Sequence, residues 1–351
     1  MLSVEKERPV IDPLHRVTID DVASRAGVHK ATVSRALNAR TRHQVNAETA
    51  ARVAEAAEAL GYVPNAMARG LRTSNSMTIG VIIPDLTNPF FPPIVRGIEN
   101  FLQPRGYTAL LANTDDSEVI ERASLDSLLG RRVDGLVVAS GSLYSSALTD
   151  AHEAGVFAVM LNRDAGSLPY PLVTGNDATG IAAAVTHLAE LGHRRILHIA
   201  GPADFSTSGT RADAFRAACS STKGVSGTVV EASALSVEAG NQTMDKVLTE
   251  RRARPTAVIA GNDLVALGVL RSLRSHGLSC PGDVSVVGFN DIEFAQDSNP
   301  PLTTVHVPML EMGTEAARIL LEAIENRAQE PLTVRLPVSL IVRGSTGPAP
   351  A

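Results

Sequence analysis

The sequence predicts a small all-α head followed by a larger α/β core built from parallel sheets. Residues 18–38 hold two short helical segments joined by a glycine, a spacing typical of a helix-turn-helix unit. From Ser76 onward, short apolar runs alternate with helical segments, which is the pattern of a parallel sheet. The runs form two series, so we expect two α/β subdomains, and a chain of 351 residues suits roughly two to three domains.

The first helix is expected to begin after Thr18, whose hydroxyl can cap it. Asp20 and Asp21 would lie in its first turn, at the positive end of the helix dipole, and Asp21 has the spacing of a capping box. Gly27 permits the turn that ends the helix. Apolar residues at helical spacing predict a buried face of Ile19, Val22, Ala23 and Ala26.

A second helix is expected from about His29 to Leu37. It would bury the apolar side chains of Val28, Val33 and Leu37. Its outer face would then carry Lys30, Ala31, Thr32, Ser34 and Arg35. Because a face of this kind suits phosphates and base edges, the pattern predicts a DNA-binding regulator. The alternative is an ordinary amphipathic helical hairpin.

A third helix is predicted from Ala47 to Leu60, with Gly61 as its stop signal. Asn65 can cap a further short segment that runs to Arg72. A helix this short is marginal in water, and Gly70 weakens it further. We expect this segment to fold only when another surface holds it.

The head and the segment behind it resemble the LacI/GalR family of bacterial transcriptional regulators. Val17 to Asn38 is similar to the head motif of that family, and Tyr62 to Leu71 is similar to its hinge. The resemblance implies a hinge helix and a set of DNA-contacting residues, namely Thr18, Lys30, Ala31, Thr32, Ser34, Arg35, Asn38, Asn65 and Leu71.

The same resemblance implies different roles within this set. Arg35 and the pair Lys30-Ala31 correspond to positions that read bases, and Leu71 corresponds to a leucine that wedges into the minor groove. The phosphate contacts fall to Thr32, Ser34 and Asn38. Simpler alternatives are a phosphate contact for Arg35 and hinge packing for Leu71.

The head departs from the family pattern at a few places. His29 stands where a Ser or Thr usually caps the second helix, which weakens the expected cap. The loop from Asn38 to Val45 is slightly longer than the usual one. The pair Lys30-Ala31 differs from well-known pairs, so the operator sequence does not follow from the resemblance.

Charge is distributed unevenly along the chain. The net charge is −5, yet residues 1–76 carry 11 Lys and Arg against 8 Asp and Glu, which leaves +3 there and −8 on the rest. The positive excess lies where DNA would bind. Because this excess is small, we expect a homodimer that places two heads on a palindromic operator.

The sequence offers no signal peptide and no membrane anchor. The residues before Thr18 are mostly polar, and no other stretch is apolar over about 18 residues. Cys219 and Cys280 lack a CxxC spacing, so we expect two reduced thiols rather than a disulfide or a metal site. A cytoplasmic protein is therefore expected.

The apolar runs of the core predict buried strands in two series. The first series comprises Thr78–Ile83, Thr108–Ala112, Gly135–Ala139 and Phe157–Leu161. The second comprises Ile196–Ala200, Ala257–Ala260 and Val284–Phe289, with helices at Ile181–Leu191 and Asp263–His276. The family resemblance implies that the series are the halves of a periplasmic-binding-protein-like core, joined by three crossovers and enclosing a ligand.

These observations divide the chain into a tail (1–17), the head (18–64), the hinge helix and linker (65–76), the core (77–345) and a C-terminal tail (346–351). By the resemblance, the first subdomain spans about 77–175 and 305–330, and the second about 176–304 and 331–345.

Candidate effector-binding residues lie at predicted strand ends and loops, where open α/β sheets bind ligands, and the family resemblance implies that they occupy its binding-loop positions. They are Asn88, Phe90, Phe91, Asn162, Arg163, Arg211, Asn262 and Asn290. The adjacent Phe90 and Phe91 are notable because the chain holds only 8 Phe, 4 Tyr and no Trp, and aromatic rings can stack on sugar faces. Helix packing is the alternative for this pair, and surface solvation for the arginines.

The amide and guanidinium groups in this set suit hydroxyl or carboxylate recognition. Asn290 stands where the family often has Asp, and Asn176-Asp177 inverts a frequent Asp-Asn order. These departures prevent a direct transfer of any known specificity. We expect a small sugar-like effector.

Catalytic motifs are absent from the sequence, which has no GxGxxG after a strand, no GxxxxGK[ST], no GxSxG and no HExxH. His187, His193 and His198 do not share one helical face, which disfavours a metal site. We expect no enzyme activity, no cofactor and no metal. A solute-binding protein or a sugar-processing enzyme is the alternative, which the head and hinge disfavour.

These features together predict a homodimeric allosteric repressor. Effector binding would change how the first subdomains of the two protomers sit, and would thereby permit or prevent hinge folding on DNA. Induction and co-repression use the same architecture. The tail after Arg343 contains no heptad repeat, so we expect a dimer without a tetramerising helix.

Overall fold

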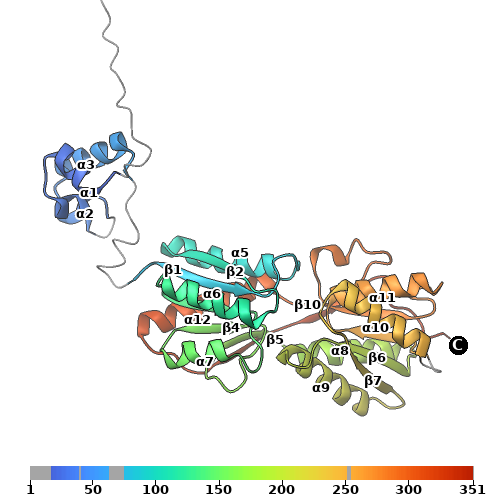
Figure 1. The fold of residues 1–351 in the computed structure, drawn as a ribbon. Coiled ribbons are helices and arrows are strands. Elements are labelled where there is room, and N and C mark those ends of the chain that lie inside the picture. The colour runs from blue at the N-terminus through green and yellow to red at the C-terminus, as the bar shows by residue number, and fades with distance from the viewer. Residues whose placement is uncertain (1–16, 39–40, 63–74, 251–253, 351) are drawn as a thin grey trace, which may run out of the picture. The chain divides into compact units, whose positions relative to one another are not determined.

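The computed structural model describes residues 17–38, 41–62, 75–250 and 254–350. The chain forms two compact units that divide after Ser76, and each is described by itself (Figure 1). The expected hinge helix falls on residues outside the described ranges.

The first unit, the head, confirms the three expected helices. They are α1 (Ile19–Ala26), α2 (Lys30–Ala36) and α3 (Ala47–Leu60), with a 3₁₀ turn, η1 (Arg42–Gln44), before α3. Thr18 and Asp21 form a reciprocal capping box at the start of α1. Gly27 and Gly61 end α1 and α3 with φ angles of 65° and 64°, which favour glycine.

Small side chains close the core of the head. Val22, Val33 and Val53, one from each helix, are fully buried and cluster with alanines. Val28 and Leu37 pack against this cluster but stay partly exposed. The outer face of α2 is therefore left to polar residues.

The second unit, the core, contains two six-stranded sheets that lie side by side in Figure 1. The first has the order β11-β5-β4-β3-β1-β2, with β1 (Thr78–Ile83), β2 (Thr108–Asn113), β3 (Gly135–Val138), β4 (Ala158–Leu161), β5 (Leu172–Gly175) and β11 (Thr333–Leu336). The second has the order β12-β10-β9-β8-β6-β7, with β6 (Arg195–Ala200), β7 (Ser226–Glu231), β8 (Ala257–Ala260), β9 (Ser285–Asn290), β10 (Thr303–His306) and β12 (Ser339–Ile341). The strand pairs are parallel, apart from the antiparallel pair of β10 and β12.

Helices connect the strands and cover the sheets. In the first half they are α5 (Phe91–Leu102), α6 (Glu118–Gly130), α7 (Ser146–Glu153) and α12 (Met309–Asn326), with the 3₁₀ turn η2 (Gln103–Arg105). In the second half they are α8 (Asp177–Glu190), α9 (Ser206–Ser221), α10 (Val237–Glu250) and α11 (Asp263–Ser275), with η3 (Glu293–Ala295). The alternation predicted from the apolar runs is confirmed.

The sheet order differs from the expected split of the core at two places. β10 ends at His306 in the second sheet, whereas residues from 305 were expected in the first half. β11 lies in the first sheet, whereas residues from 331 were expected in the second half. Both strands are only four residues long, and β11 is an edge strand that mixes polar and apolar residues. Hydrophobic periodicity therefore says little about which sheet each strand joins.

Glycines allow the closest helix contacts in both halves. A Cβ at Gly97 of α5 would collide with the Leu310 carbonyl, and one at Gly313 of α12 would collide with the Ile94 carbonyl. The same reciprocal arrangement joins α10 and α11 through Gly240 and Gly268. These helices therefore pack backbone against backbone.

Ser345 and the first residues of the expected C-terminal tail dock on the second half. Ser345 is fully buried and donates its hydroxyl to the Val286 carbonyl at 2.6 Å. His187 Nε2 lies 3.0 Å from Thr346 Oγ1, and His193 Nε2 lies 3.0 Å from the Gly347 carbonyl oxygen. Two of the three histidines considered as metal ligands thus hold this segment.

Neither a membrane span nor a metal cluster is found within the described part of the chain. No described helix is long and apolar enough to cross a membrane. No group of three or more described His, Cys, Asp or Glu side chains could hold a metal ion. Cys219 and Cys280 are both free, as expected.

Candidate functional site

The outer face of α2 carries the residues expected to contact DNA. Lys30 and Arg35 are exposed, and the partly exposed members of the set are Ala31, Thr32, Ser34 and Asn38. Lys30 Nζ lies 3.5 Å from Asp20 Oδ1 of α1. This ion pair is exposed, so salt or a competing phosphate would readily replace it.

The start of each head helix is fixed by a side chain. The Thr18 hydroxyl and backbone N–H both donate to Asp21 Oδ2, at 2.7 and 2.8 Å. His29 does act as a cap, because its Nδ1 accepts the Ala31 N–H at 3.2 Å. The structure thus shows how His29 replaces the usual Ser or Thr. Asn65 and Leu71 lie outside the described residues.

A cavity of about 380 Å³ lies where strand ends from both sheets of the core meet. All eight candidate effector-binding residues line it. The first sheet contributes the segments after β1, β2 and β4, and the second contributes the segments after β7 and β8 and the last residue of β9, together with α9. The cavity therefore brings together residues as distant in sequence as Asn88 and Asn290, as their strand-end positions and the family resemblance predicted.

Arg163 is held by contacts on both sides of the cavity. Its Nη1 donates to Asp116 Oδ1 at 2.5 Å and to the Ser140 carbonyl at 3.3 Å. Its guanidinium lies 3.6 Å from the ring centroid of Phe205, the residue that precedes α9 in the other half. The side chain is 5% exposed, so surface solvation is the wrong interpretation for Arg163.

Arg211 is equally constrained. Its Nε donates to Asp177 Oδ2 at 2.8 Å, and its Nη1 donates to the Gly261 carbonyl at 2.7 Å. The guanidinium lies 3.8 Å above the Phe289 ring. The side chains of Arg211 and Asp177 are 5% and 4% exposed, which makes this a buried ion pair.

Phe90 and Phe91 pack in the hydrophobic core and also line the cavity. Their rings meet edge to face with centroids 5.2 Å apart, and the residues are 2% and 3% exposed. Both belong to the hydrophobic core and both line the cavity. Packing and ligand stacking are therefore compatible for this pair.

The asparagines of the cavity differ in how much of their hydrogen-bonding capacity is used. Asn262 caps α11 by accepting the Val265 N–H at 2.9 Å, and it donates to the Leu235 carbonyl at 3.1 Å. Asn88 Oδ1 accepts the Phe90 N–H at 3.1 Å. Among the described residues, Asn290 Oδ1 is buried without a hydrogen-bond partner. Asn290 is thus the candidate whose unused acceptor is buried.

Sequence reasoning missed three carboxylates that line the cavity, those of Asp85, Asp115 and Asp116. Asp115 and Asp116 follow β2 directly, so the strand-end rule applied to that strand would have found them. Their φ angles are 50° and 53°, and Asn162 and Asn290 have φ angles of 65° and 118°. Such backbone strain in residues other than glycine is typical of binding sites.

One buried carboxyl lies behind the cavity. Asp263 accepts the Ile292 N–H at 2.8 Å and the Thr304 hydroxyl at 2.5 Å. Burial raises its pKa to about 7, with a smaller contribution from the charge of Asp291, although the hydrogen bonds from Thr304, Ile292 and the Asp291 backbone lower it. Asp263 therefore supports the segment after β9 rather than lining the cavity.

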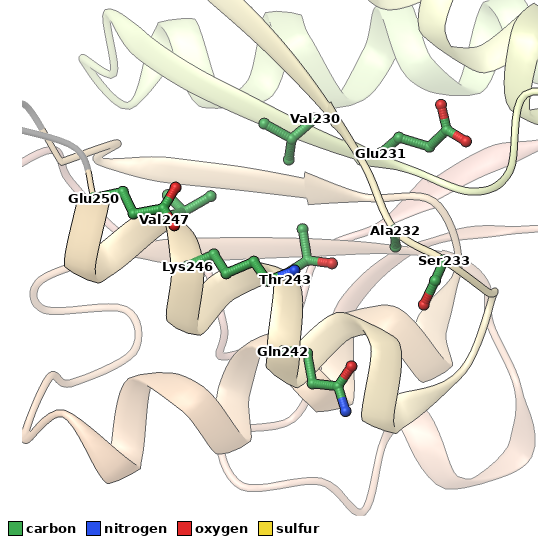
Figure 2. A pocket seen from close by; sticks show the side chains of 9 residues that line it. All are labelled: Val230, Glu231, Ala232, Ser233, Gln242, Thr243, Lys246, Val247 and Glu250. Atoms are coloured by element: carbon green, nitrogen blue, oxygen red, sulfur yellow. The ribbon is translucent and has the colours of Figure 1, made fainter.

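A second cavity, of about 470 Å³, lies between β7 and α10 at the outer edge of the second sheet (Figure 2). Val230 of the strand and Val247 of the helix lie on its walls, with Lys246 and Glu250 nearby. Its lining comes from one half of the core, and none of the candidate residues contributes to it. The inter-sheet cavity is therefore the candidate effector site.

Comparisons with known proteins match both parts of the chain. Residues 18–65 match the family described as bacterial regulatory proteins, lacI family, and residues 185–346 match the periplasmic binding protein-like domain. The chain is 34% identical over 336 residues to the HTH-type transcriptional repressor CytR of Escherichia coli strain K12, covering 95% of this chain and 97% of that protein.

Solved structures are similar over nearly the whole chain. One is the lac repressor dimer bound to operator and the anti-inducer ONPF, with a TM-score of 0.84, 28% identity and coverage of 95% of this chain and 100% of that chain. Another is the complex of the transcriptional regulator CelR with cellobiose, with a TM-score of 0.72, 32% identity and coverage of 94% and 100%.

Proposed function

The chain belongs to the LacI family of bacterial regulatory proteins, and on that premise we propose that it is a transcriptional repressor controlled by a small sugar-like effector. It acts by binding operator DNA and is not an enzyme. The observation that supports the effector site best is the inter-sheet cavity, which all eight candidate residues line.

Helix α2 is proposed to enter the major groove of the operator. Arg35 and Lys30 are the exposed cations of this face, and they would bond base edges beside Ala31. Phosphate contacts would come from Thr18, Thr32, Ser34 and Asn38. On binding DNA, Lys30 would break its ion pair with Asp20. Little free energy would be lost, because that ion pair is exposed.

The hinge is proposed to fold on DNA, with Asn65 at its start and Leu71 as a wedge in the minor groove. The replacement Leu71→Ala should then abolish the kink and weaken operator binding more than binding to random DNA. Equal weakening on both DNAs would assign Leu71 to hinge packing.

The effector cavity and the DNA-binding face of α2 are separate sites on one chain, so control of operator binding by the effector is allosteric. An effector held between the halves of the core would change how the first halves of two protomers sit, and so whether the hinges can fold. A coupling of about 1–3 kcal/mol would change operator affinity roughly 5- to 150-fold. Arg163 is suited to report closure, because it contacts Asp116 in one half and Phe205 in the other.

The assembly is proposed to be a cytoplasmic homodimer that reads a palindrome. The similar lac repressor structure is a dimer bound to operator. The tail beyond Arg343 docks on the second half of the core through Ser345, rather than forming a heptad helix. A stable tetramer in light scattering would contradict this assembly.

Selection of bound sequences from random duplex DNA tests the whole proposal. The purified full chain should enrich a palindrome, and one ligand in a panel of sugars and nucleosides should strengthen or abolish that enrichment. No enrichment under any condition would refute the regulator and favour a ligand-binding or enzymatic role for the core.

A further inference from the structure

The carboxylates and arginines of the inter-sheet cavity determine the charge of the ligand it can hold. We infer that the cavity takes an uncharged, hydroxyl-bearing effector and excludes phosphorylated or carboxylated compounds. This inference rests on the proposed function and narrows the ligand class of the same site.

Both arginines of the cavity are already neutralised from within the chain. Arg163 is paired with Asp116, and Arg211 is paired with Asp177. Each guanidinium also donates to a backbone carbonyl and lies over an aromatic ring. Because a carboxylate already balances the charge of each guanidinium group, an anionic ligand gains no net attraction from either arginine.

Further carboxylates add negative charge to the cavity. Asp85 Oδ1 accepts the N–H and hydroxyl of Thr87, and Asp115 Oδ1 accepts from Asn113 Nδ2. These partners are neutral, and no ion pair of Asp85 or Asp115 is found among the described residues. Asp85, Asp115 and Asp116 line the cavity, and Asp177 pairs with Arg211 from outside the lining, so the four carboxylates and the two guanidinium groups together carry a net charge of −2.

The buried acceptor at Asn290 indicates which neutral group of a ligand would bind there. Its Oδ1 has no partner among the described residues, and the residue is 5% exposed. A buried acceptor without a donor is costly, and a ligand hydroxyl supplies a donor whereas a phosphate dianion does not. The rings of Phe90 and Phe91 add an apolar surface for the carbon skeleton of the ligand.

Inorganic phosphate tests the charge argument without knowledge of the effector. Thermal unfolding of the full chain should show no saturable stabilisation by millimolar phosphate, whereas the Asp116→Asn variant, with Arg163 released, should show one. Glu118→Gln is the matched control, since it removes a carboxylate from the exposed start of α6 outside the cavity. Saturable stabilisation of the wild type that Arg163→Ala abolishes would overturn the inference, as would an Asp116→Asn variant that behaves like the wild type.

Pairs of compounds that differ by one phosphate give the second test. Ribose, cellobiose and adenosine are compared with their phosphate esters by calorimetry. The wild type should bind any phosphate ester about tenfold or more weakly than its neutral parent, because like charges repel strongly at this range. A phosphate ester that binds more tightly than its parent would overturn the inference while leaving operator selection, and so the proposed function, intact.

Discussion

Arg211 and Asp177 form an ion pair at 2.8 Å in which both side chains are almost completely buried. The pair lies against the cavity, so its removal affects stability as well as ligand binding. We expect Arg211→Ala to lower the free energy of unfolding by about 3–5 kcal/mol, because it leaves the Asp177 carboxylate buried without its cation.

Arg163→Ala is the matched control for this prediction. Its partner Asp116 has a side chain that is 38% exposed, so water can solvate the carboxylate once Arg163 is gone. Arg163→Ala should therefore lower the free energy of unfolding clearly less than Arg211→Ala does. Urea unfolding followed by circular dichroism measures both, since the chain has no Trp. Equal losses would show that burial of the partner carboxylate does not set the cost.

The contact between α5 and α12 should depend on its glycines. Gly97→Ala should destabilise the core by about 1–3 kcal/mol or more, because the new methyl group would meet the Leu310 carbonyl, which belongs to the backbone and cannot rotate away.

Gly209→Ala supplies the control, since Gly209 lies in α9 with nothing within 4 Å of its added Cβ. It should stabilise the core by about 0.5–1 kcal/mol through a better helix propensity. Thermal unfolding compares the two variants, and a stabilising Gly97→Ala would show that the helices can move apart freely.

His198 should make the core sensitive to acid. Its Nδ1 lies 2.9 Å from the Ile259 carbonyl oxygen, and its Nε2 is buried without a partner among the described residues. The pKa of His198 is lowered from 6.5 to about 4, mainly by burial and also by the charges of Arg211 and Arg216, while the Ile259 carbonyl acts in the opposite direction.

The sign of this effect follows from proton uptake. Below pH 6.5 the unfolded chain protonates His198 while the folded chain does not, so stability is full above this pH and falls as pH decreases toward about 4. Between neutral pH and about pH 5 the loss from this group is about 2 kcal/mol. Urea unfolding at these two pH values measures the loss of unfolding free energy on acidification, which should be smaller by about this amount in His198→Phe than in the wild type. An identical loss in both proteins would assign the acid sensitivity to other groups.

Arg35→Ala should weaken operator binding far more than binding to random DNA, because a base contact carries about 1–3 kcal/mol of discrimination. Arg52→Ala is the control, since it removes the same charge from an exposed position on α3 instead of α2. Fluorescence anisotropy with labelled operator and random duplexes measures both variants. Similar losses on both duplexes for Arg35→Ala would indicate a phosphate contact.

The sequence by itself determined the local elements and the neighbourhood of the site. Caps and stops such as Thr18 and Gly61 act within one turn of a helix, and apolar runs such as Thr78–Ile83 report burial directly, so both can be predicted without a fold. The eight cavity residues were predicted from the resemblance to the binding loops of the family, and most of them also lie near the carboxyl ends of parallel strands, which meet at one edge of a sheet.

Only the tertiary structure decided which partners those residues have. Asp177 neutralises Arg211, and β11 joins the first sheet, through contacts between segments far apart in the chain. The structure also shows that the side-chain oxygen of Asn262 caps α11. Periodicity and spacing describe one segment at a time, whereas charge balance in a cavity depends on how many segments pack together. For this reason the sequence located the effector site, and the fold determined its charge.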